Sequence, residues 1–399
     1  MSGNKPKVLM VGPWPPTTGG VTTFMRNVVR SSLKEAYDFV AFTTSRPGKR
    51  NAKDDNYGYA AILRGGLKRV AQGIFITLWH LATYPFVVLA HRPSVIQIQA
   101  SDFQAFWEAT LYVLMGKLLR RPVLMRIGGS FNRFYQTSGP LGRAAIRWAL
   151  RQPAVLVVQS EYWKNYVARL GRGAATVVLG NFVSESLVVP RASARPAAAR
   201  FLLVSGEVPR LKGAYVLLDA VRLLLARNVD AKITIMAVNE RLREVIVDAG
   251  LGSTITMLDF LEHDEALAVL RETDVFLQIS SSEGFPNALL EAMAVGCAAI
   301  VTPVGAVPEI VGEDGDCAFV VPVGDAALLA ERMERLARDR RLLAQMAAAA
   351  QRRVLERFTE RKIVPVLDRA WQLAMSAQRL KRALRRSPRA RVIPNVNKQ

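Results

Sequence analysis

The chain has 399 residues, of which 50% are hydrophobic and 22% are charged. This composition excludes a disordered protein, and the length leaves room for two domains, each with its own core. The formal net charge of +21 points to phosphate-rich partners, which are nucleic acid or anionic lipid headgroups.

The positive charge is concentrated in the first half of the chain and in its tail. Residues 1–185 carry a net charge of +16 and residues 186–375 a net charge of −3. Residues 376–399 contain eight basic residues and no acidic one. The partner that this charge attracts should therefore contact the first half and the tail.

Apolar runs of strand length alternate with longer helical stretches, which predicts βαβ units and a parallel sheet in each half. The expected strands of the first half are 7–13, 37–44, 95–100, 123–127, 155–160 and 176–179, and its expected helices are 21–34, 103–119, 141–151 and 162–170. The second half has expected strands at 201–205, 232–237, 254–258, 275–279, 298–302 and 318–321, and helices at 214–226, 264–272 and 326–338. Proline and alanine interrupt this pattern at 188–199, which indicates a linker.

Residues 70–90 contain no Asp, Glu, Lys or Arg, and they are numerous enough to span a bilayer as a helix. We reject a spanning helix, because His80 and Pro85 interrupt the segment and it lies between strands of one sheet. A buried or interfacial helix is expected instead. Basic residues precede and follow the segment, which fits a surface resting on anionic headgroups.

The most informative motif lies around an expected strand-to-helix turn, where Glu283 and Glu291 are eight residues apart. Pro286 suits the first helical turn, and the free N–H groups of Asn287 and Ala288 would face a ligand. A helix N-terminus attracts phosphate, and each carboxylate can accept hydrogen bonds from sugar hydroxyls. The spacing therefore predicts a site for a nucleotide sugar.

The same segment resembles a known family. The stretch Glu283-Gly-Phe-Pro-Asn through Glu291-Ala-Met-Ala, followed by Gly296, Thr302-Pro-Val-Gly305 and Pro308-Glu309, is similar to glycosyltransferase family 4. Members of this family are retaining sugar-nucleotide transferases of the GT-B fold, and the E-x7-E spacing is their signature. The match is specific over about residues 200–325 and general over the first half.

The resemblance implies an α/β protein in which two Rossmann-like, doubly wound domains face each other across a cleft. An acceptor-side domain would occupy 1–187 and a linker 188–199. The domain that binds the nucleotide sugar would occupy 200–360. A helix at 361–382 would cross back to the first domain, and a basic tail would occupy 383–399.

The resemblance also implies roles for individual residues. Glu283 would contact the donor sugar, Glu291 the ribose, and Lys212 the diphosphate, so that Glu283 and Lys212 are the expected catalytic residues. The expected donor-binding residues are Gly19, Gly20, Arg210, Lys212, Glu283, Gly284, Phe285, Asn287, Ala288 and Glu291. The two glycines would allow backbone N–H groups to approach the diphosphate closely.

Two positions depart from the family pattern. Glu207 stands where the family has an arginine, so one of the two expected cations is missing. Arg210 is the candidate to replace that arginine. Ile127 stands where many members have a histidine that faces the donor sugar. In a front-face retaining mechanism the leaving diphosphate oxygen accepts the acceptor proton, so no protein base is obligatory. The acceptor-side candidates are then Arg126, Ser130 and Asn132.

We expect neither a metal nor a cofactor. The D-x-D string Asp314-Gly315-Asp316 is interpreted as a turn, and the sequence contains no P-loop, G-x-G-x-x-G or zinc spacing. Cys297 and Cys317 are expected to be buried, reduced thiols. The first residues have too short an apolar run for a signal peptide, so a cytoplasmic protein is expected.

The sequence therefore predicts a metal-independent, retaining glycosyltransferase that moves a sugar from a nucleotide diphosphate donor to a hydroxyl. Its acceptor would be lipid-linked, in cell-surface polysaccharide or lipopolysaccharide synthesis, with the basic first domain docked on the inner face of the plasma membrane. Two alternatives stay open. One is an epimerase or hydrolase of the GT-B fold that acts without an acceptor. The other is a non-catalytic protein whose charge binds a membrane or nucleic acid, although nucleic acid is the less expected partner.

Overall fold

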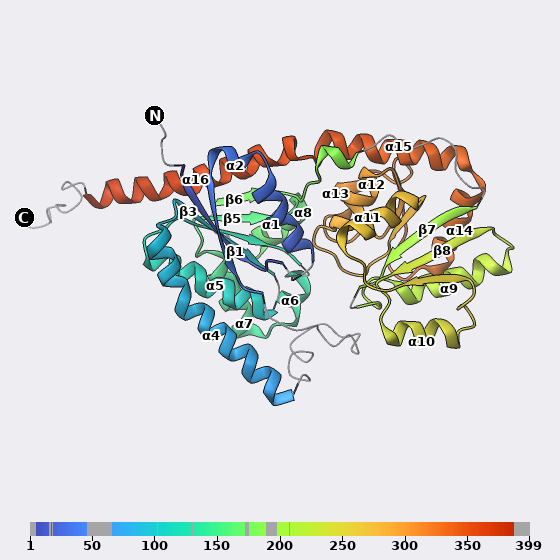
Figure 1. The fold of residues 1–399 in the computed structure, drawn as a ribbon, viewed down its shortest axis with the longest axis horizontal. Helices are drawn as coiled ribbons and strands as arrows, with labels where there is room; N and C mark the ends of the chain where they lie inside the picture. Colours follow the sequence, from blue (N-terminus) through green and yellow to red (C-terminus); the bar gives the residue numbers. More distant parts are fainter. Residues whose placement is uncertain are drawn as a thin grey trace, which may run out of the picture.

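The computed structural model describes residues 5–15, 17, 19–45, 66–101, 103–129, 131–171, 175–188, 198–206 and 208–386, without the side chains of 66–70 and 381–386. Outside this part of the chain lie Ser130, which was expected on the acceptor side, and Glu207, which differs from the family pattern. Most of the predicted linker and of the basic tail also lies outside it. The described residues form two six-stranded parallel sheets with helices on both faces, one sheet in each half of the chain (Figure 1). The predicted fold class is thus confirmed.

The first sheet has the strand order β2-β1-β3-β4-β5-β6. Its strands are β1 (Lys7–Gly12), β2 (Asp38–Thr43), β3 (Val95–Ala100), β4 (Val123–Ile127), β5 (Val155–Val158) and β6 (Ala175–Val178). All pairs are parallel, with Leu9 opposite Ile96 and Ile98 opposite Met125. Because both faces are covered, β3, β4 and β5 are buried along their whole length.

Helices cover the two faces of the first sheet unequally. The helices of this half are α1 (Gly20–Arg30), α2 (Leu33–Ala36), α4 (Gly66–His91), α5 (Phe103–Leu118), α6 (Phe131–Thr137), α7 (Pro140–Leu150) and α8 (Glu161–Arg169). α4, α5, α7 and α8 pack against the face that carries Leu9 and Ile98. α1 packs against the opposite face, which carries Met10 and Leu124.

The second sheet has the strand order β12-β11-β10-β7-β8-β9. Its strands are β7 (Ala199–Val204), β8 (Ala231–Met236), β9 (Ile255–Leu258), β10 (Val275–Gln278), β11 (Ala298–Val301) and β12 (Ala318–Val320). The helices are α9 (Ala214–Ala226), α10 (Glu240–Asp248), α11 (His263–Glu272), α12 (Asn287–Ala294), α13 (Val307–Val311), α14 (Ala326–Arg338) and α15 (Arg340–Arg357). α9, α10 and α14 cover one face, and α11, α12, α13 and α15 cover the other.

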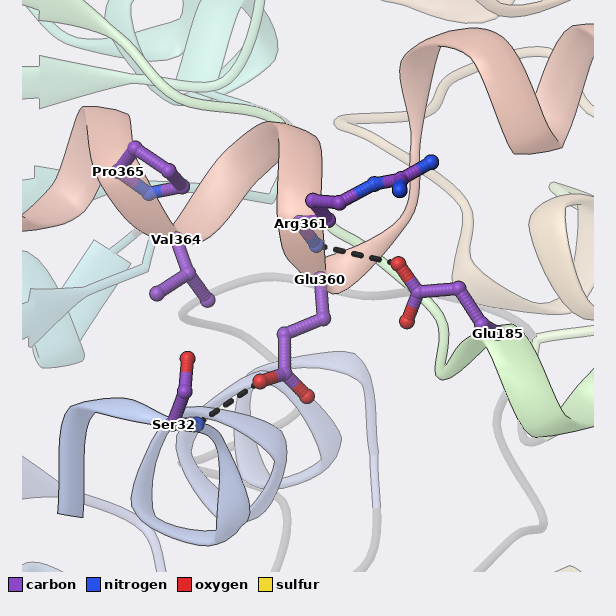
Figure 2. Close-up of a pocket in the computed structure, with 6 residues that line it drawn as sticks. All are labelled: Ser32, Glu185, Glu360, Arg361, Val364 and Pro365. Carbon is purple, nitrogen blue, oxygen red and sulfur yellow. Dashed lines mark hydrogen bonds between the residues drawn. The ribbon is translucent and has the colours of Figure 1, made fainter. Parts of the chain in front are cut away.

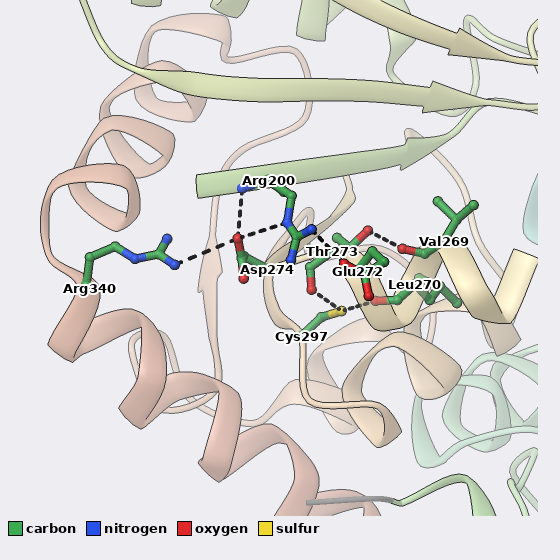
Figure 3. Close-up of polar contacts among 8 residues, drawn as sticks. All are labelled: Arg200, Val269, Leu270, Glu272, Thr273, Asp274, Cys297 and Arg340. Carbon is green, nitrogen blue, oxygen red and sulfur yellow. Dashed lines mark hydrogen bonds and ion pairs between the residues drawn. The ribbon is translucent and has the colours of Figure 1, made fainter. Parts of the chain in front are cut away.

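A buried carboxylate connects three elements at the edge of the second sheet where its strands begin. Asp274, which is 2% exposed, lies just before β10 and accepts a 2.9 Å hydrogen bond from the backbone N–H of Arg200 in β7. Its Oδ2 also lies 3.7 Å from Nε of Arg200 and 3.8 Å from Nη2 of Arg340 in α15 (Figure 3). Cys297 lies beside this cluster, and its thiol is buried, as the sequence predicts.

The chain passes between the two halves twice. A short 3-10 helix, η1 (Glu185–Leu187), follows the first sheet, and α16 (Glu360–Arg386) returns from the second half along the face of the first sheet (Figure 1). The two passages touch, because the N–H of Val183 donates to Phe358 O at 3.0 Å and the N–H of Glu360 donates to Val183 O at 3.2 Å.

Two side-chain hydrogen bonds fix the start of α16, one to Ser32 of the first half and one to Glu185 of η1. Glu360 accepts a 2.8 Å hydrogen bond from the backbone N–H of Ser32, and Glu185 accepts one of 3.2 Å from the N–H of Arg361 (Figure 2). Further along α16, the fully buried Trp371 donates from its indole N–H to Gln97 Oε1 in β3 at 2.6 Å. The C-terminal helix is therefore part of the core of the first half.

Candidate active site

Glu283 is held in the loop between β10 and α12 by three donors that converge on one carboxylate oxygen. Its Oε1 accepts hydrogen bonds from Lys212 Nζ at 2.7 Å, from Gln278 Nε2 at 2.8 Å and from Ser280 Oγ at 2.7 Å. The side chain of Glu283 is 10% exposed and that of Lys212 is 32% exposed. No donor from the described residues reaches Oε2, so this oxygen can accept from a ligand.

The loop that carries Lys212 is fixed by close backbone contact with the end of β10. Gly213 has a φ of +81°, and a Cβ at this position would lie 2.3 Å from Ile279 O. The N–H of Ser281 also donates to Leu211 O at 2.8 Å. Only glycine fits such a position, and its presence lets the loop bring Lys212 to Glu283.

Arg210, the candidate to replace the missing cation, lies elsewhere in this structure. It is exposed, and its guanidinium stacks over the ring of Tyr215, with 4.8 Å between Cζ and the ring centroid. No contact between Arg210 and Glu283 or Lys212 is present in the described structure. The structure therefore brings Lys212, but not Arg210, to the predicted donor site.

The glycine loop of the first half meets the helix that follows Glu283. α1 begins at Gly20 and α12 at Asn287, and the amide of Asn287 donates to Gly20 O at 3.0 Å. A Cβ on Gly20 would lie 3.4 Å from that amide nitrogen. Two helix N-termini from different domains thus lie together, and both favour negative charge. Gly19 is the N-cap of α1 and Ala288 is the second residue of α12, so both lie at these two helix starts.

Gly284 and Phe285 lie against the first domain through their backbone. Gly284 O accepts from the indole N–H of Trp163 at 3.1 Å, and a Cβ on Gly284 would lie 2.8 Å from Gln159 Oε1 and 3.0 Å from the backbone of Gly129. Phe285 O accepts from the amide of Asn181 at 2.9 Å. The segment between the two glutamates therefore needs glycine at 284 to approach the opposite domain.

Arg126 supports this segment from inside the first domain. It is 1% exposed, donates from Nη2 to Asn181 Oδ1 at 2.6 Å, and stacks on Phe24, with 3.8 Å between Cζ and the ring centroid. Burial lowers the pKa of Arg126 to about 9. The sequence predicts an acceptor contact for Arg126, but its buried side chain donates to Asn181, which in turn donates to Phe285 O.

Glu291 lies one turn into α12, close to the first domain. Burial raises the pKa of Glu291 to about 7, and the nearby charge of Arg26 in α1 acts in the opposite direction. Arg26 also lowers the pKa of His263 in α11, after the larger effect of burial. Arg26 was missed by the sequence analysis, although it is the first cation after the Gly19–Gly20 loop.

One buried side-chain oxygen of the first domain, Gln159 Oε1, lies beside Gly284. Asn132 Oδ1 and Gln159 Oε1 are buried and accept no hydrogen bond from the described residues. Asn132 was expected on the acceptor side, whereas Gln159, which follows β5, was not singled out. Both follow the ends of strands in the first sheet, where a doubly wound sheet binds its ligands.

A carboxylate from the second domain caps a helix of the first. Glu309 in α13 accepts hydrogen bonds from the backbone N–H groups of Glu161 at 2.9 Å and Tyr162 at 2.6 Å, at the start of α8. This bond pair holds the two domains together on the side of Gly284, whose carbonyl also accepts from Ala306 at 3.1 Å.

The D-x-D string takes part in a turn. Asp314 Oδ1 accepts a 2.7 Å hydrogen bond from the N–H of Val320 in β12. The described residues contain no group of three or more His, Cys, Asp or Glu placed to hold a metal ion.

Comparisons with known proteins agree with this geometry. Residues 189–353 match the family model "Glycosyl transferases group 1". WcaL of Salmonella typhimurium, a glycosyltransferase named for colanic acid biosynthesis, is 28% identical over 53% of this chain and 55% of its own length. The MMP alpha-(1->4)-mannosyltransferase of Mycolicibacterium hassiacum is 33% identical over 39% of this chain and 38% of its own length. The matched segments thus span about half of these relatives or less.

Solved structures match over almost the whole chain. Sucrose-phosphate synthase from Thermosynechococcus elongatus superimposes with a TM-score of 0.68 at 17% identity, over 95% of this chain and 99% of that one. Anabaena HepE in complex with UDP-glucose has a TM-score of 0.68 at 16% identity, over 94% of this chain and 100% of that one. The chain has the GT-B fold of these glycosyltransferases, and its second domain is similar to glycosyl transferases group 1.

Proposed function

We propose that the protein is a retaining glycosyltransferase of family 4 that transfers a sugar from a nucleotide diphosphate donor to a hydroxyl acceptor. The observation that carries the proposal is the ion pair of Lys212 and Glu283, placed beside two helix N-termini from opposite domains. Such a site combines a seat for a diphosphate with a carboxylate for sugar hydroxyls. HepE, which shares the fold, is known in complex with UDP-glucose, and this supports the donor class.

Each residue of the site has a task in this reaction. Lys212 has three donor hydrogens, so it can keep its bond to Glu283 while it neutralises charge on the leaving diphosphate. The N–H groups at the starts of α1 and α12 face the same charge, and Glu283 Oε2 accepts from a sugar hydroxyl. Glu291 accepts from the ribose. The leaving diphosphate oxygen takes the acceptor proton, so the reaction needs no protein base at Ile127, and no metal or cofactor.

The acceptor is proposed to be lipid-linked, in the synthesis of cell-surface polysaccharide or lipopolysaccharide. Two proteins that are similar to this chain are named for polysaccharide biosynthesis. They are WcaL of Salmonella typhimurium, named for colanic acid, and AmsK of Erwinia amylovora, named for amylovoran. The charge of residues 1–185 and of the tail is opposite to that of an anionic leaflet. The protein would then act in the cytoplasm, docked on the inner face of the plasma membrane.

Nucleotide binding tests the proposal first. A saturating nucleoside diphosphate, at about 100 times its dissociation constant, should stabilise the protein by about 2.7 kcal/mol in a thermal-shift assay with UDP, GDP or ADP. Lys212→Met should reduce this shift, and Lys232→Met, which removes an exposed lysine from β8, should leave it unchanged.

The outcomes separate the alternatives. A shift with none of the three nucleotides would contradict the transferase and favour a binding protein. Consumption of the nucleotide sugar at the same rate with and without any hydroxyl acceptor would favour the epimerase or hydrolase.

A further inference from the structure

The outward face of α4 is apolar from Ile74 to Leu89, over about four turns. Within the described part of this helix, the large exposed side chains that share the face are Ile74, Phe75, Leu78, Trp79, Phe86 and Leu89, called the α4 face below. Phe75 is 67% exposed, Trp79 61% and Phe86 72%. The steps from 75 to 78, 82, 86 and 89 are three or four residues, so these positions line one side of the helix. In the most apolar stretch of α4, which lies within Ala71–His91, 11% of the residues are buried in the protein.

Three polar residues of the same helix, Thr77, His80 and Tyr84, point toward the protein. Thr77 donates to Glu108 of α5 at 2.9 Å, and His80 packs edge-on against Phe42 of β2. Tyr84 is fully buried, with its ring 4.9 Å from that of Tyr112. A helix at a water-exposed surface has the reverse pattern, with polar residues outward. The solvent-facing side of α4 is therefore suited to contact with an apolar partner.

Cations surround the C-terminal end of this helix. Arg121 donates to the carbonyls of Pro93 at 3.3 Å and Arg92 at 3.5 Å, directly after α4. Gln378 of α16 donates to Arg120 O at 3.0 Å, which brings the end of α16 and its Arg379 to the same place. Between residues 56 and 160 the sequence has twelve Lys or Arg and two acids, Asp102 and Glu108.

We propose that the α4 face inserts into the interface of an anionic lipid bilayer, with the helix lying along the membrane surface. An apolar face between cations fits acyl chains below and negative headgroups beside it. Trp79 suits the boundary between the two. A dimer packed through this face would instead bring the cations of both copies together. Repulsion between these like charges would oppose such a dimer.

The helix lies on the membrane and does not cross it. β2 before α4 and β3 after it both pair with β1, so the two flanking strands belong to one sheet on one side of the membrane. A crossing helix would also carry Thr77, His80 and Tyr84 away from Glu108, Phe42 and Tyr112 into lipid.

The orientation places the site near the membrane, and this part of the inference rests on the proposed function. α4 precedes β3 and runs back against it, so Phe75 and Trp79 lie toward the edge of the sheet where the strands end. Gly129 and Gln159 follow strands at that same edge, beside Gly284. A lipid-linked acceptor would then reach the site from the bilayer that holds α4.

Vesicle flotation with the full-length protein tests the insertion. The probes are vesicles of phosphatidylcholine alone and of phosphatidylcholine with 30% phosphatidylglycerol. Phe75→Ser/Trp79→Ser/Phe86→Ser should weaken binding to the anionic vesicles about a hundredfold or more. The matched control Leu225→Ser/Val247→Ser/Phe260→Ser removes similarly exposed apolar residues from the second domain and should bind like wild type. Equal melting temperatures of wild type and the two triple variants would show that both variants fold.

Trp79 provides a second, local readout. Lipids brominated in the upper acyl chain should quench the fluorescence of wild type on vesicles. Trp79→Phe should keep the binding and lose part of the quenching. Equal quenching in the two proteins would contradict insertion at this helix.

Three further outcomes would overturn the inference. The first is that wild type does not bind anionic vesicles at low salt. The second is that the control triple variant loses as much vesicle binding as the α4 triple variant. The third is a vesicle-independent dimer in sedimentation velocity that dissociates in the α4 triple variant, which would make a second copy the partner. Nucleotide binding, measured by calorimetry, should be the same in all variants. Its absence from wild type would contradict the proposed function and leave the vesicle result standing.

Discussion

Lys212 Nζ lies 2.7 Å from Glu283 Oε1, although the two residues come from loops that are 71 positions apart in the chain. Each loop follows a strand of the second sheet, β7 or β10, and these two strands are neighbours. The fold therefore fixes the distance between the ammonium group and the carboxylate through the sheet itself. Gln278 and Ser280 hold the carboxylate from the other side, so its position does not depend on a flexible side chain alone.

Glu283→Ala should suppress sugar transfer by about 10²–10³-fold, because a preorganised contact to the reacting sugar is lost. The affinity for the free nucleoside diphosphate should stay close to that of wild type, since the proposed partner of Glu283 is the sugar. Initial rates and calorimetry measure the two quantities. Glu244→Ala, at an exposed position of α10, is the control. A Glu283→Ala variant with wild-type rates would contradict the assigned role.

Glu291 should make nucleotide binding depend on pH. Burial raises its pKa to about 7, so the carboxylate, which we propose accepts from ribose hydroxyls, forms as the pH rises from 6 to 8. The dissociation constant should fall over this range, by about tenfold at most. Glu291→Gln should bind more weakly at pH 8 and lose this dependence. Calorimetry at pH 6, 7 and 8 tests this, and an identical pH profile in the two proteins would remove Glu291 from the site.

The same shift has an opposite effect on stability. A carboxyl group whose pKa is raised in the folded protein binds its proton more tightly there than in the unfolded chain. Its contribution to folding is present at low pH and is lost as the pH rises toward 7. Glu291→Gln, which keeps a neutral side chain, should therefore gain stability relative to wild type between pH 5 and pH 8 in urea denaturation.

Asn181→Ala should destabilise the protein by about 1–3 kcal/mol, because it removes the acceptor of buried Arg126 and the donor to Phe285 O. The loop of Glu283 also loses a support, so the KM for the donor should rise. Asn165→Ala, at an exposed position of α8, should change neither quantity. Urea denaturation and donor kinetics are the measurements, and a wild-type KM in the presence of reduced stability would limit Asn181 to a structural role.

Asp274→Asn should lower the free energy of unfolding by about 2 kcal/mol, because Arg200 and Arg340 lose a carboxylate that is shielded from water. Asp259→Asn breaks an ion pair with Arg243 in which the Asp259 side chain is 82% exposed, and it should cost less than about 0.5 kcal/mol. Denaturant titrations of both variants test the contrast. Equal effects would show that burial of Asp274 is not what makes its contacts strong.

Activity should survive EDTA. In the proposed reaction Lys212 and two helix N-termini neutralise the leaving diphosphate, and Asp314 is already engaged with the backbone of Val320. Rates measured with EDTA, and after addition of magnesium or manganese, should agree within error. Loss of activity with EDTA, restored by either ion, would instead assign Asp314 and Asp316 to a metal site.

The sequence predicted the fold well because strands of a covered parallel sheet are almost continuous apolar runs. Every predicted strand has a counterpart in one of the two sheets, as with Val123–Ile127 in β4. The helices α10 and α15 were not predicted. Both carry many charged residues, because only one side of each helix packs on the protein, and this weakens the apolar signal.

The structure brings together Glu283 and Lys212, two of the predicted donor-side residues, whereas Arg126, predicted on the acceptor side, is buried against Asn181. Glu283, Pro286, Asn287 and Glu291 are local in sequence, so one motif displays their spacing. Arg126 and Asn181 are 55 residues apart, and only the pairing of β4 with β5 and the turn after β6 bring them together. An arginine in a strand has no sequence signal that distinguishes a buried support from a residue that faces a ligand.

The return of α16 to the first sheet has a consequence for the order in which the domains form during synthesis. Leu367, Ala370, Trp371 and Ala374 complete the core that begins with Val8 and Met10. A ribosome that has made residues 1–187 has therefore not yet made the last helix of the first domain. The second domain, whose strands and helices lie between 199 and 357, can close earlier. The nascent first domain must meanwhile leave uncovered the part of this sheet face that α1 does not cover, so a chain truncated before α16 should require chaperones and aggregate on release.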